Sequence, residues 1–85
     1  MSKKQQIKKN LELSEKLANF LAKHPTFMTK TPENTSFVAF SSNDPGLNKM
    51  NMRLMESLLK EGRSVVKAQQ TQNKQNPWKF TAVPA

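Results

Sequence analysis

Two short apolar segments, separated by a capped amphipathic helix, constrain the fold of this chain more than any other feature. Residues 36–41 (Ser-Phe-Val-Ala-Phe-Ser) are apolar on both faces and are bounded by turn residues, which predicts a strand covered on both sides. Residues 64–69 (Ser-Val-Val-Lys-Ala-Gln) predict a second strand. Strands joined through a helix are expected to lie parallel. The sequence therefore predicts an α/β protein.

The helix between these strands carries signals at both ends. The carboxylate of Asp44 can accept hydrogen bonds from the unpaired amides of the first turn, and Pro45 suits the first helical position, which needs no amide donor. Gly62 stands where a left-handed residue closes a helix. These signals predict a helix that runs from Pro45 to about Glu61. Its expected apolar face consists of Leu47, Met50, Leu54 and Leu58, widened by Met55 and Leu59.

A longer amphipathic helix is predicted at residues 4–23. Pro25 disfavours helical geometry at the preceding residue, so the helix is expected to end at His24. Apolar residues at helical spacing fill about half of its circumference. They are Ile7, Leu11, Leu13, Leu17, Ala18, Phe20 and Leu21.

The remaining segments are connectors and a tail. Residues 26–35 are expected to hold Phe27 and Met28 on a single turn against the core and to form a type I turn at 31–34. Residues 70–77 are polar and predict a mobile loop. Residues 78–83 alternate weakly, which predicts either a third, edge strand or an extended arm.

These elements predict one small αβαβ(β) domain with a two-layer or sandwich-like arrangement. Its sheet is expected to have two or three strands, of which the first two are parallel. Residues 1–85 form this single domain, with a basic N-terminal arm at 1–9, a core at 10–69, and a polar loop and tail at 70–85. So small a core often needs help from a second copy, which favours a homodimer.

The charge is strongly basic and lies toward the ends of the chain. Fourteen lysines and arginines against six acids give a net charge of +8. Such a balance is one footprint of nucleic-acid binding, but dispersed lysines also serve solubility. Only Arg53 and Arg63 could make bidentate contacts to phosphates or bases. Phosphate contacts from the lysine-rich termini, with Lys3, Lys4, Lys8 and Lys9 as candidates, therefore remain the alternative function.

Several chemistries lack the residues that they need. With one histidine, His24, and no cysteine, no cluster offers three metal ligands at a workable spacing. The loop at 41–46 lies where ligands bind to parallel sheets, but it has no glycine-rich phosphate fingerprint, and Asp44 places a carboxylate there. Neither an enzyme activity nor a cofactor is therefore expected.

The residues that remain point to protein contacts. Trp78 and Phe80, beside Lys79, stand in a polar tail and either fold back on the core or dock on a partner. Asn51 flanks the apolar face of the second long helix. It is either half-exposed, or buried with a hydrogen bond to a neighbouring strand or across a dimer. The leading hypothesis is a non-enzymatic protein-interaction module that forms a homodimer and also binds an unidentified protein. Its expected contact surfaces are the open strand edge and these tail residues.

The compartment follows from what the sequence lacks. Its longest apolar runs are far shorter than the roughly 20 residues of a membrane span, and no signal-peptide core follows the basic N-terminus. We therefore expect no membrane partner and a cytoplasmic location.

Several short motifs resemble a family of small prokaryotic proteins that is catalogued only as a domain of unknown function. The motifs are His24-Pro25 after a helix, Pro32, Phe37-Val38-Ala39-Phe40, Asp44-Pro45 with Leu47, Asn51, Leu54, Glu61-Gly62 and Val65-Val66. The resemblance covers about residues 10–68 and implies an αβαβ-type single domain without an assigned activity, so it transfers no functional residue. Residues 70–77 and Trp78-Lys79-Phe80 depart from the family pattern.

Overall fold

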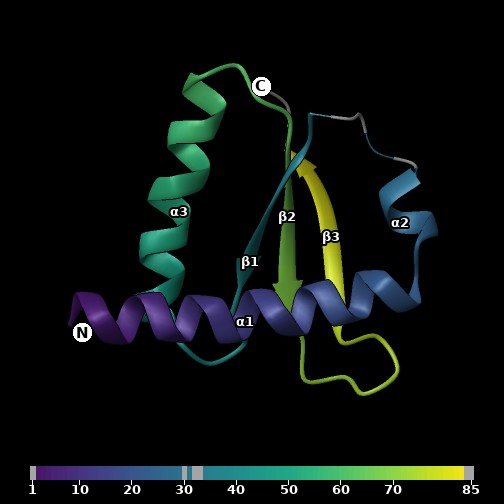
Figure 1. Ribbon diagram of the computed structural model, residues 1–85, viewed down its shortest axis with the longest axis horizontal. Coiled ribbons are helices and arrows are strands. Elements are labelled where there is room, and N and C mark those ends of the chain that lie inside the picture. Colours follow the sequence, from purple (N-terminus) through teal and green to yellow (C-terminus); the bar gives the residue numbers. More distant parts are fainter. Residues whose placement is uncertain (1, 30, 32–33, 84–85) are drawn as a thin grey trace.

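The computed structural model describes residues 2–29, 31 and 34–83. Figure 1 shows a three-stranded sheet that α1 crosses near one end, with α3 along one side and α2 at the other. The α/β fold class predicted from the sequence is thereby confirmed. The elements, in chain order, are α1 (Lys3–Lys23), α2 (Thr26–Thr29), β1 (Ser36–Phe40), α3 (Pro45–Lys60), β2 (Val65–Gln70) and β3 (Trp78–Val83).

The sheet has the order β1-β2-β3, with β2 in the centre. β1 and β2 are parallel, with Ser36 opposite Val65, as predicted. β3 is antiparallel to β2, with Trp78 opposite Gln70, so the C-terminal segment is an edge strand rather than an extended arm. The loop at 71–77 is closed at its base by a hydrogen bond of 2.7 Å from the Thr71 N–H to the Pro77 carbonyl.

Helix α1 begins at Lys3, within the segment 1–9 that was expected to form a separate basic arm. The Ser2 hydroxyl accepts a hydrogen bond from the Gln5 N–H at 3.2 Å, and the Gln5 side chain accepts one from the Ser2 N–H at 3.4 Å. This reciprocal cap satisfies two amides that a helix start otherwise leaves unpaired. Residues 3–9 therefore form the first turns of α1. The helix ends at His24, as predicted.

Helix α3 begins and ends at the residues that carry its sequence signals. The Asp44 carboxylate accepts a hydrogen bond from the Leu47 N–H at 3.1 Å, and Pro45 occupies the first turn. Gly62 adopts a φ of 79°, and its N–H donates to the Leu59 carbonyl at 3.0 Å. This left-handed conformation is accessible to glycine without a steric cost, which explains the glycine at this position.

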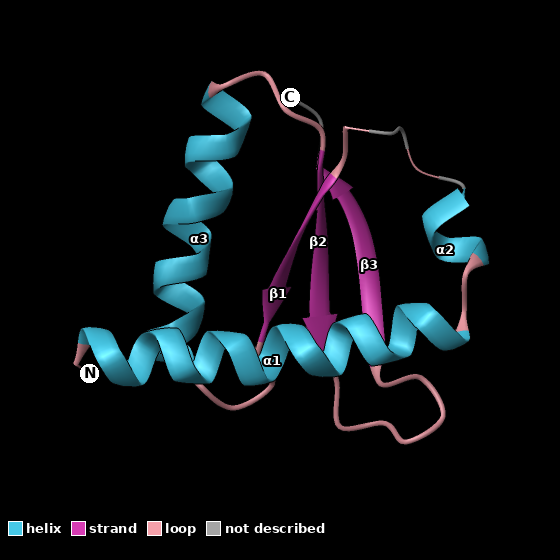
Figure 2. Cartoon of the chain, viewed as in Figure 1, coloured by secondary structure: helices cyan, strands magenta, loops and turns pink. Residues whose placement is uncertain are grey.

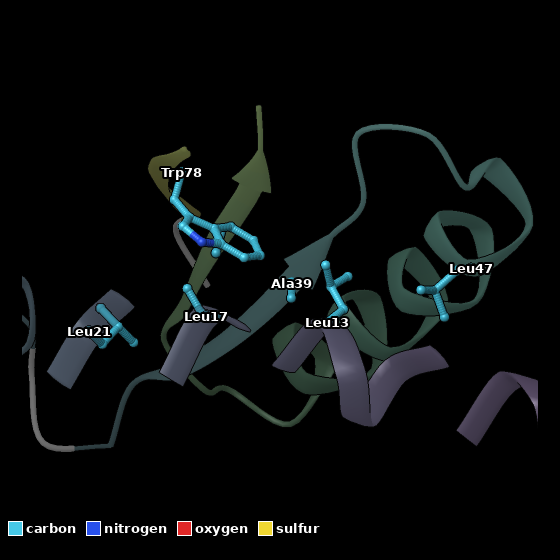
Figure 3. Packing of buried hydrophobic residues seen from close by; sticks show 7 residues of the cluster. Leu13, Leu17, Leu21, Ala39, Leu47 and Trp78 are labelled. Atoms are coloured by element: carbon cyan, nitrogen blue, oxygen red, sulfur yellow. The ribbon is translucent and has the colours of Figure 1, made fainter. Parts of the chain in front are cut away.

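Helix α1 lies on one face of the sheet, whereas α3 lies beside β1 and contributes Leu47 to the cluster of α1 and Met55 to a cluster on the other face. On one face α1 crosses the strands (Figure 2), and its leucines form the first core cluster with Ala39, Ala68 and Trp78. Figure 3 shows Leu13 and Leu17 of α1 near Ala39 and Trp78, with Leu21 further along the helix. On the other face Met55 of α3 belongs to a second cluster. The buried members of this second cluster are Val38, Phe40, Met55 and Val65. β1 is thus covered on both sides, as predicted.

The buried stripe of α3 differs from the predicted one. The buried residues are Leu47, Asn51 and Met55, whereas Met50 and Leu54, both expected on the main apolar face, are exposed. The stripe is rotated because the side chain of Asn51 bonds to the backbone of β1. The amphipathic pattern placed the helix correctly but did not identify which flank faces the sheet.

The single turn α2 lies against the aromatic residues of the neighbouring elements. The ring of Phe27 lies 5.8 Å from that of Phe20 and 4.9 Å from that of Phe80, between ring centroids. Phe27 nevertheless remains 41% exposed, so it borders the core rather than entering it. The Met28 side chain, and the centre of the turn predicted at 31–34, lie outside the described residues.

Candidate interaction surfaces

Two asparagine side chains of α3 bind the outer edge of β1 at its C-terminal end. The Ser36 N–H donates to the carbonyl of Ser64, the residue before β2, so the backbone groups of odd-numbered β1 residues such as Ala39 point away from β2. Asn51 Nδ2 donates to the Ala39 carbonyl at 2.8 Å. Asn48 accepts from the Ser41 N–H at 2.6 Å and donates to the Ser41 carbonyl at 2.8 Å. These amides take the place that an added strand would occupy.

Asn51 is therefore buried, with 3% of its surface exposed. Of the alternatives that the sequence left open, the structure shows a hydrogen bond to a neighbouring strand of the same chain. A second bond, of 3.3 Å, joins Asn51 Nδ2 to the side-chain oxygen of Asn10 on α1. Asn51 thus joins α1, α3 and β1, and it offers no surface to a partner.

Of the two alternatives that the sequence left open for Trp78, the structure shows the one in which it folds back on the core. Trp78 is 7% exposed and belongs to the core cluster beneath α1 (Figure 3). Alternation along β3 is the reason: Trp78 and Phe80 face α1, whereas Lys79 between them faces away and is exposed. The half-buried Phe80 ring lies 6.2 Å from that of Phe37, edge to face. Of the three tail residues, only Lys79 is open to a partner.

The N-terminal lysines do not share one face. Lys3, Lys4, Lys8 and Lys9 are all exposed on α1, and at 100° per residue their positions spread around the helix. Lys9 Nζ also lies 3.1 Å from the Asp44 carboxylate, so part of this charge is paired within the domain. The structure therefore does not bring these four candidates together as a single basic stripe.

The loop after β1, the position where an enzyme site was considered, is tied up by structural contacts. Asp44 uses one oxygen to cap α3 and the other to bind Lys9. The hydrogen bond from the Leu47 N–H, and then the one from Lys9, hold the pKa of Asp44 below its ordinary value. His24 caps α1, with its ring 4.3 Å from that of Phe20. Within the described ranges, no three His, Asp or Glu side chains gather to hold a metal ion.

Four large apolar side chains lie exposed around the contact between α1 and α3. Ile7 and Leu11 lie within one turn of Asn10 on one side of α1, and Met50 and Leu54 lie within one turn of Asn51 on one side of α3. The hydrogen bond between the two asparagines therefore places both pairs near the contact of the two helices. Their exposed fractions are 58% for Ile7, 65% for Leu11, 36% for Met50 and 47% for Leu54. We call these four side chains the α1–α3 apolar surface. It was not anticipated from the sequence, which placed all four residues in the core.

A basic groove lies on the opposite side of the domain. It runs between α3 and the sheet face turned away from α1, and its volume is about 560 Å³. We define this basic groove by the residues that matter for its chemistry, which are Phe40, Lys49, Met52, Arg53, Glu56, Lys67 and Gln69. It could not be identified from the sequence, because its cations come from two elements that only the fold brings together.

Comparison with known proteins supplies a family but no activity. None of the helices in the described part of the chain has the length and apolar character that crossing a membrane requires. The chain matches no curated protein and no solved structure. Residues 5–78 match a family described as "Family of unknown function (DUF5647)". This match confirms the resemblance to a family of unknown function, and it extends beyond the expected range, through the polar loop to Trp78. The chain belongs to the DUF5647 family of unknown function.

Proposed function

We propose that this domain is a non-enzymatic protein-interaction module that forms a homodimer through the α1–α3 apolar surface. The observation that carries the proposal is the grouping of Ile7, Leu11, Met50 and Leu54 at one helix contact, with between 36% and 65% of each residue exposed. With these exposures the four side chains present roughly 400 Å² of surface, comparable to the largest apolar patch on a typical monomer.

The overall dimensions of the chain support association. The domain measures 35 × 33 × 17 Å, so it is a thin slab. Its accessible surface is 6280 Å². A compact monomer of this mass exposes about 5,100 Å². The chain therefore leaves more surface exposed than its size requires, and a second copy is one way to bury the excess.

The area of the apolar surface fits a symmetric dimer. When two copies meet about a two-fold axis, the same patch on each is buried, which removes roughly 800 Å² of apolar surface in total. With the polar rim of a typical interface the buried area reaches about 1,300 Å², within the range of specific complexes. At β1, strand addition is hindered at the end of the strand, where Asn51 binds Ala39 and Asn48 binds the following Ser41. The exposed apolar side chains lie on α1 and α3, so we assign the contact to these helices rather than to a strand edge.

Sedimentation equilibrium tests the proposal. We expect the wild-type chain to show twice the monomer mass at micromolar concentration. The variant with Leu11→Glu and Leu54→Glu should be a folded monomer, because both positions are exposed and the charges would oppose each other across the axis. Asn19→Glu with Lys23→Glu, at exposed positions of α1 away from the surface, is the control and should stay dimeric. A monomeric wild type, or a dimer that survives Leu11→Glu with Leu54→Glu, overturns the proposal.

Nucleic-acid binding through the lysine-rich termini is the alternative, and the net charge of +8 is what supports it. Lys4 and Lys8 lie one turn apart on α1, and both are exposed. Binding of this kind would weaken steeply with salt, because it rests on the release of counterions from phosphates. Anisotropy of a labelled single-stranded RNA, measured with the wild type and with Lys4→Glu and Lys8→Glu combined, tests it. No binding at low salt, or equal binding by both proteins, excludes this alternative.

A further inference from the structure

We propose that the basic groove binds an extended acidic segment of another protein. The groove lies on the sheet face opposite α1, so it is separate from the α1–α3 apolar surface, and this inference does not depend on the proposed dimer. The proposal rests on three properties of the groove: unpaired cations, an exposed apolar side chain beside them, and the spacing of the charges.

The groove concentrates positive charge without pairing it. Lys49 and Arg53 contribute from α3 and Lys67 from β2, against one acid, Glu56. Among the described residues, the ion pairs within 4.0 Å join Lys9 to Asp44 and Arg63 to Glu61, and neither lies in the groove. Cations that line a concave surface raise the local concentration of anions. The groove is thus suited to an acidic ligand.

Lys67 is the most informative of these cations. It occupies the central strand on the same face as the buried Val65, at a position where strand alternation would place an apolar residue. Its ammonium group lies over the Phe40 ring, 4.8 Å from the ring centroid, which holds the charge at the floor of the groove. Because α3 leaves this part of the sheet uncovered, Lys67 remains accessible to a ligand.

The groove favours a peptide over nucleic acid. Its aromatic residue, Phe40, is 3% exposed beneath Lys67 and cannot stack with a base. Asn48 and Gln69 also line the groove, but their side-chain amides already donate hydrogen bonds to backbone carbonyls. These amide groups are therefore not free to form hydrogen bonds with the edges of bases. In contrast, the exposed Met52 offers apolar contact beside the cations, which suits a peptide whose carboxylates alternate with apolar side chains.

The spacing of the helix cations also fits an extended chain. Lys49 and Arg53 are four residues apart on α3, which corresponds to about 6 Å along the helix axis. Side chains on one face of an extended strand are about 6.6 Å apart. Acidic residues at alternate positions can therefore meet Lys49 and Arg53 in succession. The sequence of this chain has no two acidic residues at alternate positions, so a second copy does not supply such a segment and the occupant is a different, acidic protein.

The test uses the full chain and a fluorescently labelled eight-residue peptide in which glutamate alternates with valine. Binding is measured by anisotropy at low and high salt. Lys49→Glu with Arg53→Glu reverses two groove cations, and the matched control, Lys4→Glu with Lys8→Glu, reverses two exposed cations of the same spacing on α1. Lys67→Met keeps the apolar stem over Phe40 and removes only the charge. Circular dichroism confirms that each variant is folded.

We expect Lys49→Glu with Arg53→Glu, the groove reversal, to weaken peptide binding at least tenfold, and Lys67→Met to weaken it severalfold. The control variant, here called the α1 reversal, should change peptide binding less than twofold. Equal loss in the groove and α1 reversals would show attraction to net charge alone and would overturn the proposal. So would a wild-type chain that does not bind the peptide. Single-stranded RNA serves as a second probe. Tighter binding of RNA than of peptide, with loss in the groove reversal, would reassign the groove to nucleic acid.

Discussion

The side-chain amide of Asn51, in the middle of α3, donates a hydrogen bond of 2.8 Å to the backbone carbonyl of Ala39 at the outer edge of β1. The contact is buried, and it satisfies an edge group that would otherwise be available to another strand. It also sets the rotation of α3, because the residues on either side of Asn51 are fixed relative to the sheet. Burial of Met55 and exposure of Met50 and Leu54 both follow from it.

Replacement of Asn51 by alanine is therefore expected to destabilise the domain. The Ala39 carbonyl would be left buried without its partner, which typically costs about 1–3 kcal/mol of the free energy of unfolding. Urea unfolding followed by circular dichroism measures this loss. Asn19→Ala, at an exposed position of α1, should change the free energy by less than about 0.5 kcal/mol. Equal effects of the two substitutions would show that the bond to Ala39 contributes nothing specific.

The second prediction concerns Trp78, which is buried in the core and therefore contributes to stability. Trp78→Ala should cost about 3–5 kcal/mol through lost burial and the cavity left beneath α1. Lys79→Ala, at the exposed neighbouring position, is the control and should have a small effect. The tryptophan fluorescence of the folded chain should be blue-shifted and should move to longer wavelength in urea. A solvent-like emission from the folded chain would contradict the burial of Trp78.

The secondary structure could be predicted because its signals are local. Asp44, Pro45 and Gly62 act within a few residues of the helix ends that they define, so they marked α3 almost to the residue. The apolar run of β1 likewise identified a strand that is covered on both faces. Local chemistry of this kind does not depend on what the rest of the chain does.

The surfaces could not be predicted because they depend on long-range contacts. The helical pattern places polar residues such as Asn51 outside the buried face. Asn51 can nevertheless be buried because its side-chain amide donates a hydrogen bond to the Ala39 carbonyl. Trp78 stands among polar residues, yet pairing with β2 turns it toward α1. The basic groove left only a weak signal in the sequence, namely Lys49 and Arg53 one helical turn apart and Lys67 inside an apolar strand. Tertiary structure decides how such signals combine.

Gly62 carries the third prediction. A Cβ atom added there would meet nothing within 4 Å, so space is not the constraint, but its φ of 79° is unfavourable for any residue with a side chain. Gly62→Ala should lower the free energy of unfolding by about 1–2 kcal/mol, and Gly62→Asn by less. Gly46→Ala, in the first turn of α3, should have the opposite sign, because alanine favours helix by about 0.8–1 kcal/mol over glycine. Thermal unfolding of the three variants checks whether their stabilities follow this order. An unchanged melting temperature of Gly62→Ala would contradict the prediction.

The last prediction concerns the pH dependence of stability at Asp44. The hydrogen bond from the Leu47 N–H, followed by the contact with Lys9, lowers the pKa of Asp44 below 3.8 in the folded chain. A group whose pKa is depressed on folding stabilises the protein fully above its unfolded pKa. That contribution is lost as the pH falls through the folded pKa, because the folded state must then take up a proton that it binds poorly. The affected window therefore begins near pH 4 and extends to lower pH.

Asp44→Asn isolates this contribution, since asparagine can still cap α3 but carries no charge for Lys9. We expect the wild type to be more stable than Asp44→Asn at pH 6, and the difference in melting temperature to shrink steadily below pH 4. Glu15→Gln, which removes an exposed carboxylate from α1, serves as the control for the loss of one acid. If the difference between wild type and Asp44→Asn is the same at pH 6 and pH 2.5, the charge of Asp44 does not stabilise the contact between α1 and α3. The neutral cap would then account for all of its effect.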